Sequence, residues 1–181
     1  MTDTTIDARF LEVFPQWLRS LGEDAVQVGE LVGAATEDDE VVRSLVGGLN
    51  YIFKSLDLIP DGIDDLGLLD DAFVLRVACA LVVAARPEAK QGVVQRLSDD
   101  ARAVRDFLGP VYGRLEGYVI GLRNGAARGR TVDAIVTEPE TRAEFVGEVR
   151  AWSAAYQVPA FTRDMKTLVK LRAFLEAKLP E

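Results

Sequence analysis

Apolar residues recur along the whole chain at spacings of three and four, and clean alternating runs are nearly absent. Side chains at these spacings share one face of an α-helix, whereas a half-buried strand would alternate. The pattern therefore predicts an all-α fold, a compact bundle of about eight helices. The predicted helical segments are 6–21, 24–35, 37–56, 71–86, 87–97, 99–108, 111–122, 138–156 and 162–179.

Local residue types set the expected helix ends. Pro15 indicates a kink or break, and Gly22 can end the first helix. A hydroxyl side chain suits the N-cap because its oxygen accepts a hydrogen bond from a first-turn amide. The expected N-caps of this kind are Thr36, Ser98 and Thr137. The segment 71–86 is apolar on nearly every side, so it should form the central and most buried helix.

Gly109-Pro110 breaks the helical pattern and is the best candidate for a subdomain boundary. It divides the chain into a helical core, 1–108, and a C-terminal helical extension, 109–181, which is expected to pack on that core. With 181 residues, 49% of them hydrophobic, the chain can bury a real core. Gly47-Gly48 lies inside a predicted helix and should permit a close helix–helix approach, because glycine there otherwise costs about 1 kcal/mol.

The most unusual stretch runs from 51 to 75 and reads YIFKSLDLIPDGIDDLGLLDDAFVL. Pro60-Asp61-Gly62 is turn chemistry, since proline fixes φ and glycine supplies a positive φ where one is needed. Ile59 precedes the proline and is pushed toward extended geometry, so the incoming helix should stop near Leu56 or Asp57. Between 57 and 71 the stretch holds no base and six acids: Asp57, Asp61, Asp64, Asp65, Asp70 and Asp71.

The residues after the turn predict where the next helix starts. Asp70 or Asp71 fits an N-cap, where a carboxylate also suits the positive end of the helix dipole. The intervening aliphatic side chains are too apolar to lie in water: Leu58, Ile59, Ile63, Leu66, Leu68 and Leu69. The stretch is therefore interpreted as an acidic helix-turn-helix connector at 57–71 that is pinned to the core.

The motif here combines Tyr51 with the run Asp57-Leu58-Ile59-Pro60-Asp61 and the spacing Gly67-x-x-Asp70-Asp71. It resembles the YkvA-like domain of bacterial proteins over positions 40–85. The resemblance implies a short helical domain of unknown function, often found beside membrane segments, and brings no established activity. It also implies that the family-typical acids are Asp57, Asp61, Asp70 and Asp71. The chain departs from the family at three places: Ser55, where proline is usual, Gly62, where a bulky apolar residue is usual, and Asp64-Asp65, where a proline and an apolar residue are common.

Crowded carboxylates repel one another, and relief comes from a hard divalent cation, hydrogen bonds or raised pKa values. An EF-hand starting at Asp57 is excluded because Ile59 and Leu68 would stand at ligand positions. Three alternatives stay open. The first alternative is that the acids are turn and helix-cap residues, which their positions favour. The second is that they form an acid–base pair in an enzyme, but no partner residue for such a pair is seen. The third alternative is a Mg²⁺ or Ca²⁺ site with four ligands: Asp57, Asp61, Asp70 and Asp71.

Charge is divided unevenly along the chain. Residues 1–100 carry 8 Lys/Arg and 19 Asp/Glu, a net charge of −11, and residues 101–181 carry 13 and 10, a net charge of +3, which together give −8. So acidic a chain is a poor general binder of nucleic acid, whose phosphates it repels. The basic C-terminal part can dock on an acidic surface, its own or a partner's. The glycine-containing loop at 123–130 contains Arg123, Arg128 and Arg130. It is interpreted as a solvated loop, and the alternative is that it binds a phosphate group.

Absent residue types exclude much chemistry. The chain has no histidine, which excludes Ser-His-Asp and Cys-His catalysis and His-ligated zinc or haem. Its single cysteine, Cys79, allows no internal disulfide and is expected to be an inert core residue. No signal peptide is visible, and the best apolar run, 72–85, is too short for a membrane span and is interrupted by Arg76. These features favour a cytoplasmic location.

The leading interpretation is a non-enzymatic, cytosolic helical interaction or scaffold protein that acts through a protein partner or through self-association. The first alternative is a divalent-metal-binding protein or metal-dependent hydrolase that uses the acidic connector. The second alternative is peripheral membrane association through an amphipathic helix such as 162–179.

Overall fold

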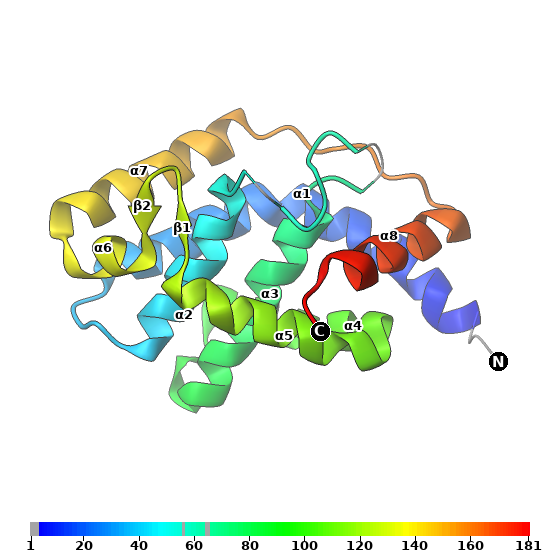
Figure 1. Ribbon diagram of the computed structural model, residues 1–181, viewed down its shortest axis with the longest axis horizontal. Coiled ribbons are helices and arrows are strands. Elements are labelled where there is room, and N and C mark those ends of the chain that lie inside the picture. Colours follow the sequence, from blue (N-terminus) through cyan, green and yellow to red (C-terminus); the bar gives the residue numbers. More distant parts are fainter. Residues whose placement is uncertain (1–3, 56, 64–65) are drawn as a thin grey trace.

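The structure is a computed structural model that describes residues 4–55, 57–63 and 66–181 (Figure 1). The predicted all-α class is confirmed, and the predicted number of helices is close. The α-helices of the described residues are α1 (Thr4–Ala34), α2 (Glu40–Asn50), α3 (Leu69–Ala85), α4 (Gly92–Leu108), α5 (Tyr112–Gly121), α6 (Val132–Thr137), α7 (Pro139–Ala155) and α8 (Met165–Lys178). Short 3₁₀ turns cover Tyr51–Phe53, Pro87–Ala89, Gly109–Val111 and Leu122–Asn124, and one hairpin joins β1 (Ala126–Ala127) to β2 (Arg130–Thr131).

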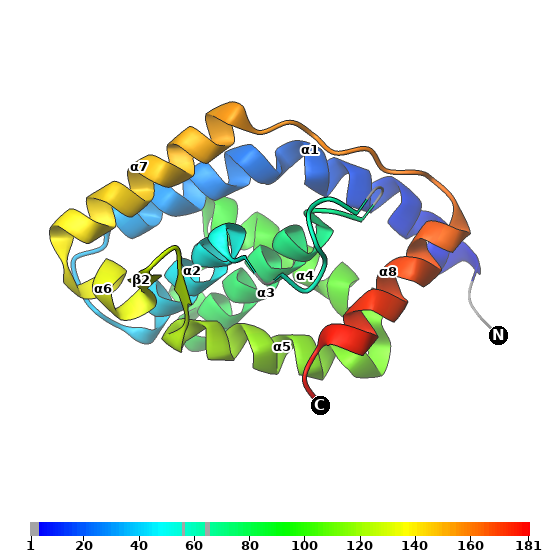
Figure 2. The ribbon, with the colours of Figure 1, turned by 45° about the horizontal axis from the view of Figure 1, so that its top comes forward.

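Helix α3 lies in the middle of the bundle, as the sequence predicts. Every residue from 69 to 79 is buried, and α2 and α4 pack against this helix. Helices α1 and α7 run side by side along one flank, and α8 lies near the N-terminal part of α1 (Figures 1 and 2). The acidic connector of residues 57–71 therefore enters the most buried helix of the fold.

The structure joins the two predicted helices 6–21 and 24–35 into the continuous helix α1. Pro15 lies inside α1 without ending it. Burial of one unbroken apolar stripe, which includes Phe14 and Leu18, outweighs the backbone hydrogen bond that proline cannot donate. Gly22 does not end the helix either. A Cβ at Gly22 would lie 3.1 Å from both Ser153 Oγ and Tyr156 Cδ1, so this glycine allows α7 to lie close to α1.

All three predicted N-caps are wrong. Asp39, not Thr36, caps α2, and its Oδ1 accepts a hydrogen bond from Val42 N at 3.0 Å. Ser98 lies inside α4, where its hydroxyl donates to the carbonyl oxygen of Gln95 at 3.0 Å. The buried stripe of α4 continues through this position, so the predicted segments 87–97 and 99–108 form a 3₁₀ turn and one helix.

The third predicted cap, Thr137, is also displaced. Thr131 caps α6 by accepting a hydrogen bond from Ala134 N at 3.0 Å, whereas Thr137 is the last residue of that helix. Helix α7 starts at Pro139, since proline is favoured in the first turn and keeps Glu138 extended.

The loop that was interpreted as solvated contains the hairpin. Ala126 pairs with Thr131 and Ala127 with Arg130. The two turn residues, Arg128 and Gly129, both have positive φ (51° and 76°), which is the backbone conformation that a two-residue hairpin turn requires. No apolar alternation marks such short strands, so the sequence pattern could not show them.

The core continues across residue 108, the predicted boundary. One cluster of buried apolar side chains includes Phe73 of α3, Phe107 of α4 and Phe145 of α7. A Cβ at Gly48 would lie 2.8 Å from the Cβ of Ala78, which confirms that this glycine permits close packing of α2 on α3.

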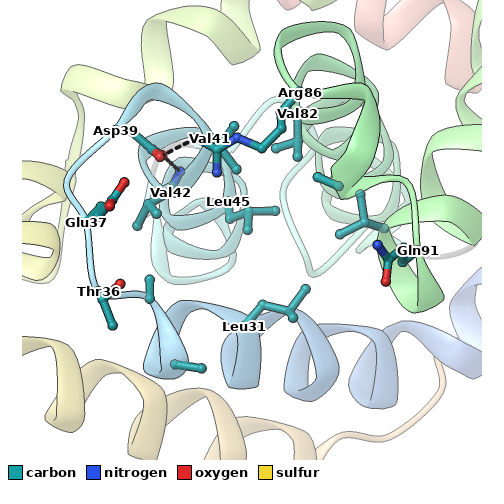
Figure 3. Close-up of a pocket in the computed structure, with 14 residues that line it drawn as sticks. Leu31, Thr36, Glu37, Asp39, Val41, Val42, Leu45, Val82, Arg86 and Gln91 are labelled. Atoms are coloured by element: carbon teal, nitrogen blue, oxygen red, sulfur yellow. Dashed lines mark hydrogen bonds and ion pairs between the residues drawn. The ribbon is translucent and has the colours of Figure 1, made fainter.

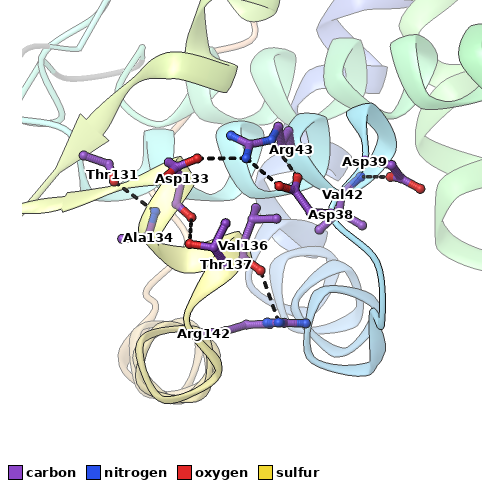
Figure 4. A network of polar contacts seen from close by, with 10 residues as sticks. All are labelled: Asp38, Asp39, Val42, Arg43, Thr131, Asp133, Ala134, Val136, Thr137 and Arg142. Carbon is purple, nitrogen blue, oxygen red and sulfur yellow. Dashed lines mark hydrogen bonds and ion pairs between the residues drawn. The ribbon is translucent and has the colours of Figure 1, made fainter.

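Ion pairs also join the two parts of the chain. Arg43 of α2 donates to Asp38 and to Asp133 of α6, each at 2.8 Å (Figure 4). The basic loop is held in the same way, because Arg123 donates to Glu40 at 2.6 Å. Arg123 thus places a base of the C-terminal part on an acid of the N-terminal part, whereas Arg43 and Asp133 pair in the opposite sense.

Candidate functional site

Buried side chains hold the acidic connector against the core at both ends and in its middle. Helix α2 ends at Asn50, earlier than predicted, and a 3₁₀ turn carries Tyr51 into the core; Leu56, the predicted end, lies outside the described residues. Leu58 is 5% exposed, and Ile59 and Leu66 are fully buried, which confirms the prediction that the connector is pinned to the core.

A buried hydrogen-bond node fixes the path of the connector. The hydroxyl of Tyr51 donates to Asp70 Oδ2 at 2.5 Å and accepts from Leu58 N at 2.7 Å. The amide of Ile59 donates to the same oxygen of Asp70 at 3.2 Å. Asp70 therefore holds the end of α2, the connector and the start of α3 together.

The start of α3 differs from the prediction. The N-cap is Leu68, in a left-handed conformation (φ 67°), and it makes no side-chain capping bond. Asp70 and Asp71 instead lie within the first turn of the helix, where the positive end of the helix dipole still favours negative charge. Gly67 allows the connector to fold back on itself, because a Cβ there would lie 2.3 Å from the carbonyl oxygen of Asp61.

We use the name carboxyl cluster for the four predicted acids Asp57, Asp61, Asp70 and Asp71. Asp70 is fully buried and Asp71 is 1% exposed, whereas Asp57 is half-buried and Asp61 is exposed. Within the described ranges, four buried oxygens of this cluster have no hydrogen-bond donor: Asp57 Oδ1, Asp70 Oδ1, Asp71 Oδ1 and Asp71 Oδ2. The structure thus brings a surface pair and an interior pair of acids into one electrostatic group.

Burial raises the pKa of every member of the carboxyl cluster, and like charge raises it further at Asp57, Asp70 and Asp71. Burial, followed by the charges of Asp70 and Asp61, raises the pKa of Asp57 to about 7. Burial also raises the pKa values of Asp70 and Asp61. The pKa of Asp71 rises well above its usual value, first because of burial and then because of the charges of Asp70, Asp61 and Asp57.

The surroundings of the cluster supply little positive charge. Lys54 is close enough to lower the pKa of Asp57 slightly, but its Nζ donates to the hydroxyl of Tyr118 at 3.3 Å. The ring of Tyr118 packs edge-on against that of Tyr51, with ring centroids 6.1 Å apart. Among the described residues, no three acid, cysteine or histidine side chains are grouped as a ready-made metal cage. Asp64 and Asp65 lie outside the described residues.

The arginines of the loop at 123–130 already pair with acids of the protein itself. Arg123 donates to Ser44 Oγ at 2.8 Å and to Glu40 at 2.6 Å, and Arg130 pairs with Glu148. The guanidinium of Arg128 lies 4.9 Å from the ring centroid of Phe53. These contacts do not favour the phosphate cradle, since a phosphate would have to compete with carboxylates already in place.

A second candidate site is a groove of about 420 Å³ where the end of α1, the start of α2, the end of α3 and the start of α4 meet (Figure 3). We call it the α1–α4 groove. Aliphatic side chains line it: Leu31, Val41, Val42, Leu45, Val82 and Val94. Leu31 is 43% exposed, so this groove presents apolar surface to solvent.

The rim of the α1–α4 groove is acidic. Arg86 donates to Asp39 Oδ2 at 2.6 Å. That hydrogen bond, and then the charges of Glu88 and Glu37, raise the pKa of Arg86. Three acids therefore surround one base. A second hollow, of about 580 Å³, lies beside α5 and is lined by four glycines, Tyr118, Leu122 and the chain end at Pro180 and Glu181.

Sequence reasoning missed two features. The first is Arg76, which was noted only as an interruption of an apolar run but is fully buried and pairs with Asp24 and Asp100. A lone arginine in an apolar helix was the available signal, because a buried charge needs partners. The second is the α1–α4 groove, whose lining comes from four helices and so leaves no continuous signal.

Comparison with known proteins assigns no relative: no family model matches the chain, and neither a curated protein nor a solved structure is significantly similar to it. The resemblance to YkvA-like domains therefore depends on the motif residues alone. None of the described helices is both long and apolar enough to cross a membrane.

Proposed function

We propose that the protein is a non-enzymatic helical interaction protein whose α1–α4 groove binds an amphipathic helical segment of a protein partner. The observation that carries this proposal is the aliphatic lining of the groove, at whose edge Leu31 is 43% exposed. An amphipathic helix laid in an apolar groove is a common mode of peptide recognition, with anchors at i, i+3, i+4 and i+7.

The charge of the rim specifies the kind of helix. Glu37, Asp39 and Glu88 lie around Arg86, so the rim carries more negative than positive charge. A segment with aliphatic anchors and flanking lysine or arginine complements this surface, and opposite charge raises the association rate and excludes acidic competitors. The partner class is therefore a basic amphipathic helix.

Two further parts of the proposal concern location and fold family. A cytoplasmic location is supported by Cys79, which is buried and forms no disulfide. A bacterial YkvA-like domain is supported by the motif residues of the connector. Membrane contact through α8 has less support, because the apolar side chains Leu168, Leu171 and Leu175 of that helix are buried in the core.

A displayed library of amphipathic helical peptides, selected on the purified protein, tests the proposal. We expect enriched peptides to carry aliphatic anchors at helical spacing with basic flanks. Leu31→Ser should weaken their binding about tenfold, since one exposed anchor contact contributes about 1–2 kcal/mol. Val169→Ser is the matched control, because Val169 is 68% exposed on the distant helix α8.

A charge reversal tests the second half of the proposal. Glu37→Lys should weaken binding and reduce its dependence on salt, whereas Glu144→Lys, on the exposed side of α7, should not. Selected peptides that bind the Leu31→Ser protein as tightly as the wild type, or a selection that enriches acidic sequences, would contradict the groove as the binding site.

A further inference from the structure

The carboxyl cluster contains more buried negative charge than its hydrogen-bond donors can stabilise. Tyr51 and Ile59 both donate to Asp70 Oδ2, and no described residue donates to Asp70 Oδ1. Asp71 is 1% exposed, and in the part of the chain that the structure describes neither of its oxygens has a donor. Oδ1 of Asp57 likewise has no donor there. Buried carboxylate oxygens without partners are rare in proteins and indicate a proton, an ordered water or an ion that satisfies them.

The protein itself stabilises a buried aspartate differently elsewhere. Asp24 is also 1% exposed, but it accepts from Arg96 at 2.6 Å and from Ser20 at 2.8 Å, and Arg76 lies 3.6 Å away. No comparable base reaches Asp71 among the described residues. Buried Asp24 is therefore paired with arginine, whereas buried Asp71 has no base among the described residues.

The arrangement of the cluster gives a cation both an approach and ligands. Asp61 is exposed and Asp57 is half-buried, and the charges of both act on the buried Asp71. All the groups on offer are oxygens, which hard divalent cations such as Mg²⁺ and Ca²⁺ prefer over nitrogen or sulfur ligands.

We propose that the carboxyl cluster binds one hard divalent cation through the open oxygens of Asp57, Asp70 and Asp71, with Asp61 on the solvent side. The described side chains do not yet form a closed cage of three, so binding draws the Asp57 side chain of the connector toward the interior pair. This site is separate from the α1–α4 groove and does not depend on the function proposed for that groove.

Thermal unfolding tests the proposal with the metal alone as the probe. The purified protein is melted with EDTA and then with Mg²⁺, Ca²⁺ or Mn²⁺ at matched ionic strength. An ion at 100 times its dissociation constant should raise the melting temperature by roughly 5–10 °C. The Mg²⁺ and Ca²⁺ samples distinguish the two ions, because Mg²⁺ retains water ligands and Ca²⁺ accepts more protein oxygens.

The variant Asp71→Asn keeps the shape of the side chain and removes its charge. With EDTA we expect its melting temperature to equal or exceed that of the wild type, because a buried like charge has been removed. The ion-dependent rise should disappear. Glu144→Gln, which removes one exposed charge from α7, is the control and should keep the full rise.

Calorimetry adds a readout that a structural role would not change. At pH 7 a bound cation displaces protons from carboxyl groups whose pKa values burial has raised, so the heat of binding should depend on the ionisation enthalpy of the buffer. The proposal is overturned if no ion changes the melting temperature, or if Asp71→Asn retains the rise. Should Asp71→Asn not fold, Asp57→Asn is judged by the same criteria, since Asp57 is only half-buried.

Discussion

Helix α3 contributes to two groups of charged side chains, and the two groups are stabilised in different ways. Around Arg76, charges of both signs are interleaved: its Nε donates to Asp100 Oδ2 at 3.2 Å, and its guanidinium lies 4.1 Å from the ring centroid of Trp17. In the carboxyl cluster all the charges are negative, and the main donors are the Tyr51 hydroxyl and one amide.

The difference shows in the ionisation of each group. Burial lowers the pKa of Arg76 to about 10, while Asp100 and Asp24 oppose that shift, so Arg76 stays charged at neutral pH. In the carboxyl cluster, burial and neighbouring charge act in the same direction and both favour protonated acids. The Arg76 group is therefore a paired structural element, and the carboxyl cluster is a site whose charge can change.

The largest expected effect comes from breaking the paired group. Arg76→Met should lower the free energy of unfolding by about 3–5 kcal/mol, because it breaks a buried group in which Arg76 pairs with both Asp24 and Asp100. Chemical denaturation measures the change. Arg86→Met is the control, since its ion pair with Asp39 is partly exposed and should contribute far less to the free energy of unfolding. Similar losses in both variants would show that burial does not distinguish the two ion pairs.

An intermediate loss of stability is expected when the hydrogen bonds of the Tyr51 hydroxyl, which hold the connector in place, are removed. Tyr51→Phe removes the donor to Asp70 Oδ2 and the acceptor of Leu58 N without changing the ring. We expect a loss of about 1–3 kcal/mol in the free energy of unfolding, the usual cost of leaving buried polar groups unpaired. Tyr118→Phe, whose hydroxyl is only partly buried, should cost less. If the two variants were equally stable, the connector would not depend on the Tyr51 hydroxyl.

The smallest effect is a dependence of stability on pH. The folded protein holds the pKa of Asp57 at about 7, above the usual 3.8, and that of Asp71 is also raised. Between these values the folded state binds more protons than the unfolded state, so stability falls as the pH rises from about 4 to 7. The chain has no histidine, and the acids whose pKa values are lowered, such as Asp38, titrate below this range.

With EDTA present, the melting temperature should therefore be a few degrees lower at pH 8 than at pH 5. Asp57→Asn should flatten this dependence, since it removes one of the groups that titrate in the range. A melting temperature that is constant or rises between pH 5 and 8 would show that the cluster holds no extra protons. Asp133→Asn, at an exposed ion pair with Arg43, is the matched control.

Much of the connector was predictable because its signals are local. The apolar residues Leu58, Ile59 and Leu66 predicted a connector pinned to the core, and the acids Asp70 and Asp71 were correctly placed at the start of α3. Their roles were not predictable: the N-cap position is taken by Leu68, and Asp70 instead accepts a hydrogen bond from Tyr51, nineteen residues earlier. A capping prediction considers only the helix itself, whereas a carboxylate binds the best donor that the fold brings near it.

The predicted helix ends were wrong where a buried apolar stripe continues past a residue that often ends helices. Pro15, Gly22 and Ser98 are residues that often end helices, yet each lies inside a helix here. In each case one apolar stripe continues on both sides, and the burial of that stripe contributes more than the local cost. The sequence could not show this, because the surface against which the stripe packs comes from other helices.

The sequence by itself determined the helical class, the buried centre at α3 and the acidic connector that leads into it. These features follow from spacings of three and four residues, which any helix converts into one face. Only the tertiary structure decided which buried acids are paired and which are left open. Asp24 receives Arg96 from 72 residues away, while Asp71 receives no base among the described residues. Charge pairing depends on distance in space, and local periodicity carries no information about it.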